Sequence, residues 1–180
     1  MTTLQKRDVK AVLPDAAALP GWRHIGRSRV ETDPYTCMIW TRKDPCRDVL
    51  VTGSANFTRG PQRTTRWLRF SFFVFSCRTT SAAHHLYSKL PDYRPLPAEA
   101  KRPKLGDESA ASRNLLNGEH PTAEIYNKIR VGHTVVLTFA AGLEKAVTAE
   151  RAEKAARLQT ERVLQAHHGF KPTAQATRVP

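Results

Sequence analysis

The adjacent carboxylates Asp107 and Glu108 are the first candidates for chemistry in this chain. Paired carboxylates are the usual groups of general acid–base catalysis, provided that both reach one substrate. The residues around them predict a short strand, roughly 105–110, and neighbouring side chains on a strand point to opposite faces. We therefore expect the two carboxylates to diverge, with Asp107 serving as a hydrogen-bond acceptor in a loop rather than as a catalyst.

Histidine spacing does not indicate a metal site. Helical metal sites usually place two histidines four residues apart, and the chain has no such pair. The adjacent pairs His84-His85 and His167-His168 diverge by about 100° around a helix. Glycine-rich phosphate loops and the serine nucleophile elbow are also absent from the sequence. We expect no metal, no cofactor and no catalytic residue.

The three cysteines are Cys37, Cys46 and Cys77, and an odd number cannot pair completely within one chain. Three reduced thiols are one interpretation. In an oxidising compartment either Cys37–Cys46 or Cys37–Cys77 forms, and the sequence does not decide between them. We carry Cys37–Cys77 forward as the candidate disulfide.

A basic and aromatic stretch, Arg59–Arg78, is the strongest binding signal. Aromatic rings on a strand with arginines between them can stack bases, as in proteins that bind single strands. Core packing explains the rings more simply. We keep Arg66, Trp67 and Arg69 as candidate ligand-binding residues.

The clearest structural signal is the segment Glu124–Phe139, which predicts a β-hairpin. If Gly132-His133 forms a two-residue turn, Ile129 faces Val136 and Lys128 faces Leu137. A continuous strand with a bulge at Gly132 is the competing interpretation. The hairpin would place 134–139 inside a sheet and 124–131 nearer its edge.

The two faces of this hairpin differ. Aliphatic residues occupy one face: Ile125, Ile129, Val131 and Val136. On the other face Lys128 and Arg130 lie beside apolar residues of the second strand. Either a helix seals this face over the lysine and arginine stems, or the face stays open as a basic-rimmed apolar groove. Lys128 and Arg130 are therefore further candidate ligand-binding residues.

The remaining elements follow from periodicity and turn residues. Residues 67–77 predict a strand buried on both faces and paired with 134–139, and Asn117-Gly118 predicts a turn. Three helices and two weaker strands are expected: helices at 8–18 (shortened by Pro14), 81–90 (capped by Ser81) and 144–168 (ended by Gly169), and strands at 35–41 and 49–57 with a turn at Asp44-Pro45. Residues 92–104 are rich in proline and predict an extended loop or a short linker.

The long C-terminal helix is expected to turn a narrow stripe of small side chains toward the sheet. Its outer face should carry the i,i+4 pairs Glu150–Lys154 and Glu153–Arg157. The stripe consists of Ala149, Ala152, Ala156, Gln159, Val163 and Ala166.

The net charge is +13, with hydrophobic residues at 40% and charged residues at 25%, a composition typical of globular proteins. The charge is uneven, because residues up to Leu105 hold 19 Lys/Arg against 8 Asp/Glu, whereas 10 oppose 8 from Gly106 onward. A basic surface attracts polyanions such as nucleic acid, and equally serves solubility. No apolar run is long enough to span a bilayer, and no export signal is evident.

Several fragments occur in a characteristic order: Leu19–Trp22 after a short helix, Leu105–Ser109, Ile129–Gly132 followed by Thr134–Leu137, and an Ala/Gln-rich C-terminal helix. Taken together, they resemble a family of actinobacterial lipoproteins similar to the extracellular sensor domain of mycobacterial-type receptor serine/threonine kinases. The resemblance covers most of residues 9–168. It implies an antiparallel sheet flanked by helices, a cleft for an unidentified ligand, disulfides and no catalytic activity.

The chain departs from this family in two respects: it shows no export signal or membrane helix, and its cysteine count is odd. The resemblance implies an extracytoplasmic protein, whereas the missing signal peptide implies a cytoplasmic one. Either the reading frame starts downstream of a lost signal, or this member works inside the cell. The family has no established ligand motif, so the resemblance transfers no binding residue.

These observations predict an α+β fold with a single layer of central antiparallel sheet, flanking helices and a long C-terminal helix. We expect one sensor-like domain over 1–170 and a flexible tail over 171–180. The expected function is non-enzymatic binding of an unidentified small or polymeric ligand, with an anionic ligand favoured by the basic half. The alternative is a basic protein that binds nucleic acid or another polyanion.

Overall fold

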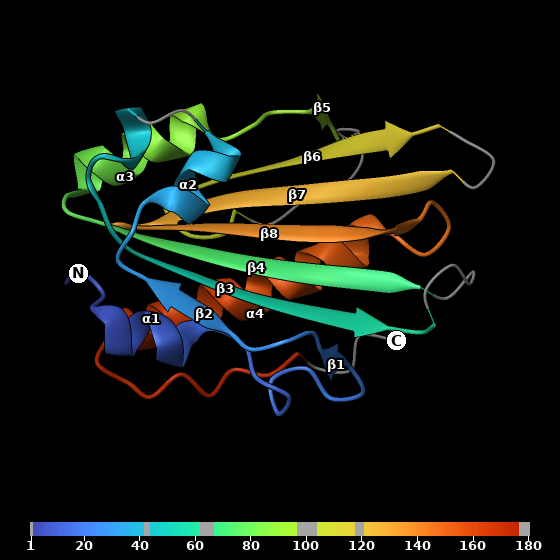
Figure 1. Cartoon of the computed structure of the whole chain (residues 1–180), viewed down its shortest axis with the longest axis horizontal. Helices are drawn as coiled ribbons and strands as arrows, with labels where there is room; N and C mark the ends of the chain where they lie inside the picture. Colours follow the sequence, from blue (N-terminus) through green and yellow to red (C-terminus); the bar gives the residue numbers. More distant parts are fainter. Residues whose placement is uncertain (1, 42–43, 62–66, 97–103, 118–120, 177–180) are drawn as a thin grey trace.

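An antiparallel sheet organises the chain (Figure 1). The structure, a computed structural model, describes residues 2–41, 44–61, 67–96, 104–117 and 121–176. The strands are β1 (Arg23–His24), β2 (Arg29–Glu31), β3 (Val49–Arg59), β4 (Leu68–Cys77), β5 (Arg94–Pro95), β6 (Glu108–Leu116), β7 (Thr122–Val131) and β8 (Thr134–Leu143). Their order in the sheet is β1-β3-β4-β8-β7-β6-β5, with β2 pairing with β3, so the predicted α+β class and central antiparallel sheet are confirmed.

The predicted hairpin forms β7 and β8 with the expected register. Ile129 pairs with Val136 and Lys128 pairs with Leu137. Gly132 has a φ of 56°, a conformation that glycine adopts without a steric penalty, so the turn and not a bulge connects the strands. β8 lies in the interior of the sheet between β4 and β7. β7 is one position closer to the β5 edge and is still paired on both sides.

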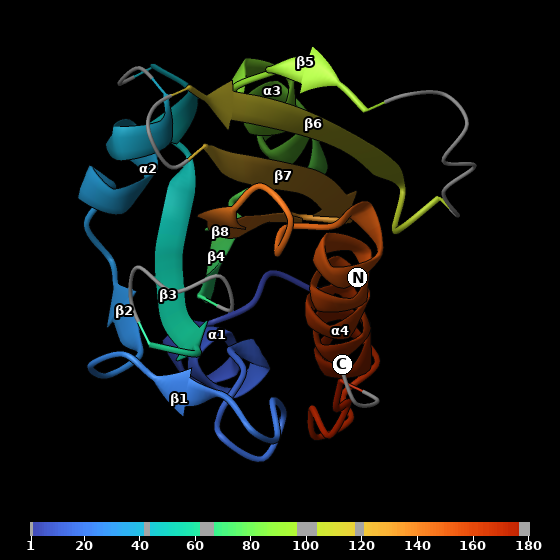
Figure 2. The ribbon, with the colours of Figure 1, turned by 90° about the vertical axis from the view of Figure 1, so that its right-hand side faces the viewer.

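The two faces of the sheet are covered differently. Helices α1 (Lys6–Val12) and α4 (Ala149–His167) lie on one side, which we call the back face, and the sheet curves around them (Figure 2). Helices α2 (Tyr35–Trp40) and α3 (Thr80–Lys89) lie on the front face. Figure 1 shows that they cover only one end of it.

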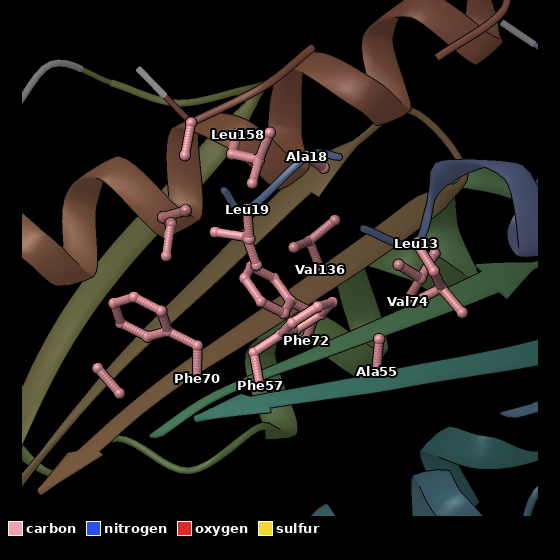
Figure 3. Close-up of a cluster of buried hydrophobic side chains, with 14 of the residues drawn as sticks. Leu13, Ala18, Leu19, Ala55, Phe57, Phe70, Phe72, Val74, Val136 and Leu158 are labelled. Carbon is pink, nitrogen blue, oxygen red and sulfur yellow. The ribbon is translucent and has the colours of Figure 1, made fainter. Parts of the chain in front are cut away.

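β4 is buried on both faces over its second half, as its alternating aromatic residues predict. Phe70, Phe72 and Val74 belong to the back core together with Phe57, below Leu19 and Leu158 (Figure 3). Front-facing Phe75 belongs to a second, smaller core under α2 and α3. The predicted pairing of this strand with β8 is confirmed.

α4 begins later than expected but presents the predicted stripe. Thr148 is its N-cap and accepts a hydrogen bond from the Arg151 amide at 3.3 Å. The small or short side chains that face the sheet are buried: Ala152, Ala155, Ala156, Gln159 and Val163. The predicted pairs Glu150–Lys154 and Glu153–Arg157 are present on its outer side, and Gly169 ends the helix with a φ of 76°.

Two local predictions on the front face are wrong. Residues 35–41 form helix α2 rather than a strand, because Pro34 occupies the N-cap and Asp33 Oδ1 accepts a hydrogen bond from the Tyr35 amide at 2.7 Å. Asp33 and Pro34 thus provide a helix start that the β-favouring composition of the segment hides. α3 is capped by Thr79, which accepts from Ala82 N, and not by Ser81.

The disulfide joins Cys37 to Cys46, so the candidate pair Cys37–Cys77 is corrected. It links α2 to a single turn of 3-10 helix at Asp44–Cys46, where a simple turn was expected. Cys77 is a buried free thiol, and burial together with the charge of Asp48 raises its pKa to about 12. A thiol with this pKa is inert at neutral pH.

This arrangement makes thiol reactivity a direct check of the pairing. We expect native protein near neutral pH to show no reaction with a chromogenic disulfide reagent, because Cys77 is buried and protonated. Unfolding in urea without a reductant should expose one thiol, and reduction should expose all three. Two modified peptides carrying Cys37 and Cys46 before reduction would contradict the assignment.

Arg162 of α4 connects three segments of the back layer. Its guanidinium donates to the carbonyls of Ala11 at 3.0 Å, Val12 at 3.1 Å and Leu13 at 3.3 Å, at the end of α1, where carbonyls lack helical partners. It also donates to Ala174 O at 3.0 Å. Arg162 is only 5% exposed.

Residues 171–176 follow α4 and are held in place, although a flexible tail was expected from 171. Gln165 Oε1 accepts from the Thr173 and Ala174 amides, and Ala176 N donates to Ala18 O at 2.9 Å. Residues 177–180 lie outside the described residues, as do Gly118 of the predicted turn and residues 97–103 of the proline-rich loop.

Replacement of Arg162 should therefore destabilise the fold. Arg162→Met keeps most of the aliphatic stem but removes the donor from the buried Leu13 carbonyl and from the half-buried carbonyls of Ala11 and Ala174, so we expect a loss of at least about 3 kcal/mol in the free energy of unfolding by urea. Arg157→Met, which removes only an exposed pair with Glu153, should cost less than about 0.5 kcal/mol. Equal losses of stability in the two variants would contradict the role assigned to the hydrogen bonds of Arg162.

Candidate functional site

A hollow of about 490 Å³ lies beside the first half of β6. Its volume is within the range of sites that bind small molecules. We call it the β6 hollow. Its lining residues come from α3, β6, β7, α4 and the segment before β6: Tyr87, Lys104, Leu105, Asp107, Glu108, Ser109, Ala110, Ala111, Asn127, Ile129 and Glu153.

Small side chains and a short neighbouring strand leave this space open. Ser109, Ala110 and Ala111 are successive β6 residues, so none of them fills the volume beside the strand. β5 pairs only with Ser112 and Arg113, and the Leu96 amide reaches Ala111 O at 3.4 Å. Among the described residues, no strand continues this pairing toward Glu108.

Arg130 holds the two adjacent carboxylates at one end of the hollow. Its Nη1 donates to Asp107 Oδ2 at 3.0 Å, and its Nε donates to Glu108 Oε1. The prediction that the carboxylates diverge is wrong, because β6 begins at Glu108 and the alternation of a strand does not extend to Asp107. The predicted role of Asp107 as an acceptor is confirmed, since Gly132 N donates to its Oδ2 at 2.7 Å.

Gly106 allows the loop before β6 to approach Arg130 closely enough for these hydrogen bonds. It has a φ of 66°, and a Cβ at this position would lie 2.4 Å from Arg130 O. A larger residue would therefore be strained by its backbone conformation and would also push the loop away from β7. The Asp107 amide donates to the same Arg130 carbonyl at 2.8 Å, so the loop binds Arg130 through both backbone and side chain.

α3 adds a histidine and a tyrosine to the site. His84 Nδ1 lies 2.9 Å from Glu108 Oε1, and this hydrogen bond, followed by the hydrogen bond and charge of Arg130, lowers the pKa of Glu108 against the opposing effect of burial. Burial raises the pKa of Tyr87 to about 12, with the charges of Glu108 and Asp92 acting in the same direction. At neutral pH Tyr87 is therefore a hydrogen-bond donor and Glu108 an acceptor.

Lys128 is sealed beneath α3 rather than exposed on a groove. Its Nζ donates to Asp92 Oδ2 at 2.8 Å and lies 4.9 Å from the centroid of the Tyr87 ring. Lys128 is 6% exposed. The sequence left two alternatives for this face of the hairpin, a face sealed by a helix and an open basic-rimmed groove. At Lys128 and Arg130 the face is covered by a helix. Both positive charges are paired with carboxylates of the same chain.

The candidate ligand-binding residues of the basic and aromatic stretch lie away from the β6 hollow. Arg69 is exposed on the front face of β4, where its Nη2 donates to Asn56 Oδ1 at 3.0 Å. Trp67 directly precedes β4 and is partly exposed, whereas Arg66 lies outside the described residues. Neither Arg69 nor Trp67 lines the β6 hollow. The structure thus separates the candidates into a sealed pair under α3 and an exposed arginine toward the opposite end of the sheet.

Sequence reasoning missed Tyr87, His84 and Glu153 as members of one site. His84 and Tyr87 are three residues apart on the predicted helix, which places them on one side, and this spacing was the available signal. Glu153 was interpreted only as an outer-face partner of Arg157. It does form that pair at 3.0 Å, and it also borders the hollow.

Comparisons with known proteins give one distant likeness. No protein-family model and no curated protein matches the sequence. Among solved structures, the chain is similar to the extracellular domain of PknH from Mycobacterium tuberculosis, with 10% identity and a TM-score of 0.49, over 88% of this chain and 97% of that one. At this level the likeness assigns no function, and membership of the sensor-domain family stays a prediction.

None of the helices in the described residues is long and apolar enough to cross a membrane. No cluster of three or more His, Cys, Asp or Glu side chains in that part of the chain is arranged to hold a metal ion.

The lowered pKa of Glu108 predicts an acid dependence of stability. The charged carboxylate favours the folded state, so its contribution is complete above the ordinary pKa of glutamate and is lost as the pH falls through the lowered value. We expect Glu108→Gln to reduce the free energy of unfolding at pH 7 and to flatten its decline between about pH 5 and pH 2.

The matched control for this titration is Glu161→Gln, which changes an exposed glutamate of α4. Urea unfolding at a series of pH values measures both variants. A decline in Glu108→Gln as steep as in the wild type would contradict the assigned role of Glu108.

Proposed function

We propose that this chain is a non-enzymatic, sensor-like binding domain whose ligand occupies the β6 hollow. The observation that carries the proposal is the hollow itself, with its volume of about 490 Å³ and its mixed lining. Ligand sites combine apolar walls with a few placed polar groups, and here Leu105 and Ile129 accompany the polar groups of Tyr87 and Asn127.

The charges of the lining favour a neutral or cationic small molecule. Among the described residues that border the hollow, Asp107, Glu108 and Glu153 are acidic and Lys104 is basic. An anionic ligand was expected from the basic N-terminal half, but no arginine from the described part of that half lines this space. An anion approaching Arg130 would have to compete with two carboxylates already bound to it.

The hydrogen bonds around the hollow support binding rather than catalysis. His84 and Glu108 form a pair of the kind that orients a general base, but Ser109 Oγ accepts from the Leu105 amide at 3.1 Å. Arg130 holds both carboxylates, which favours a structural role for them over general acid–base catalysis. A ligand that draws Asp107 or Glu108 away from Arg130 would loosen the loop from β7, and this coupling is how binding would be sensed.

Filling the hollow should abolish binding. Ala111→Phe places a ring in this space, whereas Ala141→Phe makes the same change at a partly exposed position on β8, outside the lining. With a fixed set of small amines, amides and carboxylates, ligand-observed NMR should detect amines or amides binding to the wild type and to Ala141→Phe but not to Ala111→Phe.

Circular dichroism and thermal unfolding establish that both phenylalanine variants are folded. The proposal fails if no compound of the set binds the wild type, or if Ala111→Phe binds the same compounds equally well. Preferential binding of the carboxylates would refute the argument from the charges of the lining.

A further inference from the structure

We propose that the open half of the front face binds single-stranded nucleic acid. Helices α2 and α3 cover only one end of this face (Figure 1). The strand register places arginines and small polar residues toward the other end. We call this surface the arginine face. It consists of the exposed Arg23, Arg29 and Arg69 and the partly exposed Ser54 and Asn56, together with Thr58 and Ser71, which are only 5% and 2% exposed, and it is bordered by Trp40, Phe73 and Phe139.

The strand register brings these residues to one side. Directly paired residues of an antiparallel sheet share a face. Thr58 pairs with Arg23 on β1 and with Arg69 on β4, so the three form a row across the strands. Arg29 pairs with Ser54, which lies four residues before Thr58 on β3 and therefore on the same face.

The spacing of the three arginines fits contacts with separate phosphates. Adjacent strands are about 4.8 Å apart, so Arg23 and Arg69, which lie two strands apart, have backbones about 10 Å from one another. Four residues along β3 separate the row of Arg29 from that of Arg23 by about 13 Å. The long side chains extend from these points into solvent.

The arginines of this face are available for an anionic partner. Arg23, Arg29 and Arg69 are exposed, and within the described residues none forms an ion pair with a carboxylate. Asn56 Oδ1 positions Arg69 and also accepts from Ser71 Oγ at 2.6 Å. Lys128 and Arg130, at the covered end, have carboxylate partners. Among the described front-facing residues of the strands, the positive charges without an ion pair are therefore those of the arginine face.

Acidic groups at the borders of the arginine face accept hydrogen bonds from uncharged side chains. Glu31 on β2 accepts from the Thr36 hydroxyl at 3.1 Å. Glu124 on β7 accepts from Asn114 at 3.0 Å and from the Tyr126 hydroxyl at 2.9 Å. Neither carboxylate is bound to an arginine of this face, so the charge of the face is positive between them.

Aromatic rings border the arginine face and make nucleic acid a better partner than a polyanion without bases. Phe73 and Phe139 are partly exposed and front-facing, and Trp40 lies with its ring centroid 5.0 Å from that of Phe73 and 6.4 Å from that of Phe139. Bases of a single strand stack on such rings, whereas a duplex keeps its base faces inside. No residue of the arginine face lines the β6 hollow.

A charge-matched comparison tests the arginines. Fluorescence anisotropy with an oligothymidylate of about 15 nucleotides should show binding by the wild type that weakens with salt. The triple variant Arg23→Gln/Arg29→Gln/Arg69→Gln should bind more weakly, and the slope of log K against log salt should fall by about 2, since each phosphate contact on a single strand contributes about 0.7.

The control is Arg47→Gln/Arg94→Gln/Lys145→Gln, which removes the same charge from exposed positions outside the arginine face. It should keep the wild-type slope and lose little affinity. Absence of oligothymidylate binding by the wild type at low salt, or equal losses in the two triple variants, would overturn the proposal.

The rings are tested separately. Phe139→Leu, and Phe73→Leu as a second variant, should weaken oligothymidylate binding by about 5- to 100-fold, because base stacking is lost. Their affinity for inorganic polyphosphate should not change. Tighter wild-type binding to polyphosphate or to duplex DNA than to oligothymidylate, or leucine variants that stay folded and bind oligothymidylate as the wild type does, would refute a single-strand site.

Discussion

Antiparallel pairing of β3, β4, β8 and β7 decides which side of the sheet each side chain occupies. The turn at Gly132 aligns Ile129 with Val136, and the β4 register then aligns Val136 with Val74. A slip of one residue would exchange the two faces of a strand. Aliphatic and aromatic residues would leave the back core and polar residues would enter it, so the hydrophobic effect enforces one register. Both proposed sites depend on this sorting.

Positive charges on the front face are either paired with carboxylates or exposed to water. Under α3, where burial makes an isolated charge costly, Lys128 and Arg130 each have carboxylate partners. At the uncovered end, the exposed Arg69 donates to the Asn56 amide oxygen and forms no ion pair within the described residues, because water can solvate its charge. The positive charge of the chain therefore resides where water reaches it, and an anionic partner would meet it there.

Local patterns predicted the elements whose packing follows from their own sequence. The hairpin, the two-sided burial of β4 and the sheet-facing stripe of α4 all have a period that matches their secondary structure. The strand predicted at 35–41 was wrong, because the aromatic and β-branched residues of this segment favour a strand. The segment instead forms α2, which starts at Asp33-Pro34 and is linked to the following turn by the Cys37–Cys46 disulfide. The convergence of Asp107 and Glu108 depends on where β6 begins, which its sequence does not mark.

The candidate sites required long-range information. Arg23 and Arg29 join Arg69 only because β1 and β2 both pair with β3, far along the chain. Tyr87, Ile129 and Glu153 meet only because α3 and α4 lie on opposite faces near the same strands. Short strands such as β1 and β2 have too few residues to show a period, so their pairing partners could not be predicted.

The register of the front face can be measured most directly by cross-strand nuclear Overhauser effects in solution. The account predicts contacts that connect Thr58 with both Arg23 and Arg69, Ser54 with Arg29, and Ile129 with Val136. A set of contacts displaced by one residue on β1, β2 or β4 would move the arginines to the covered side and contradict the account.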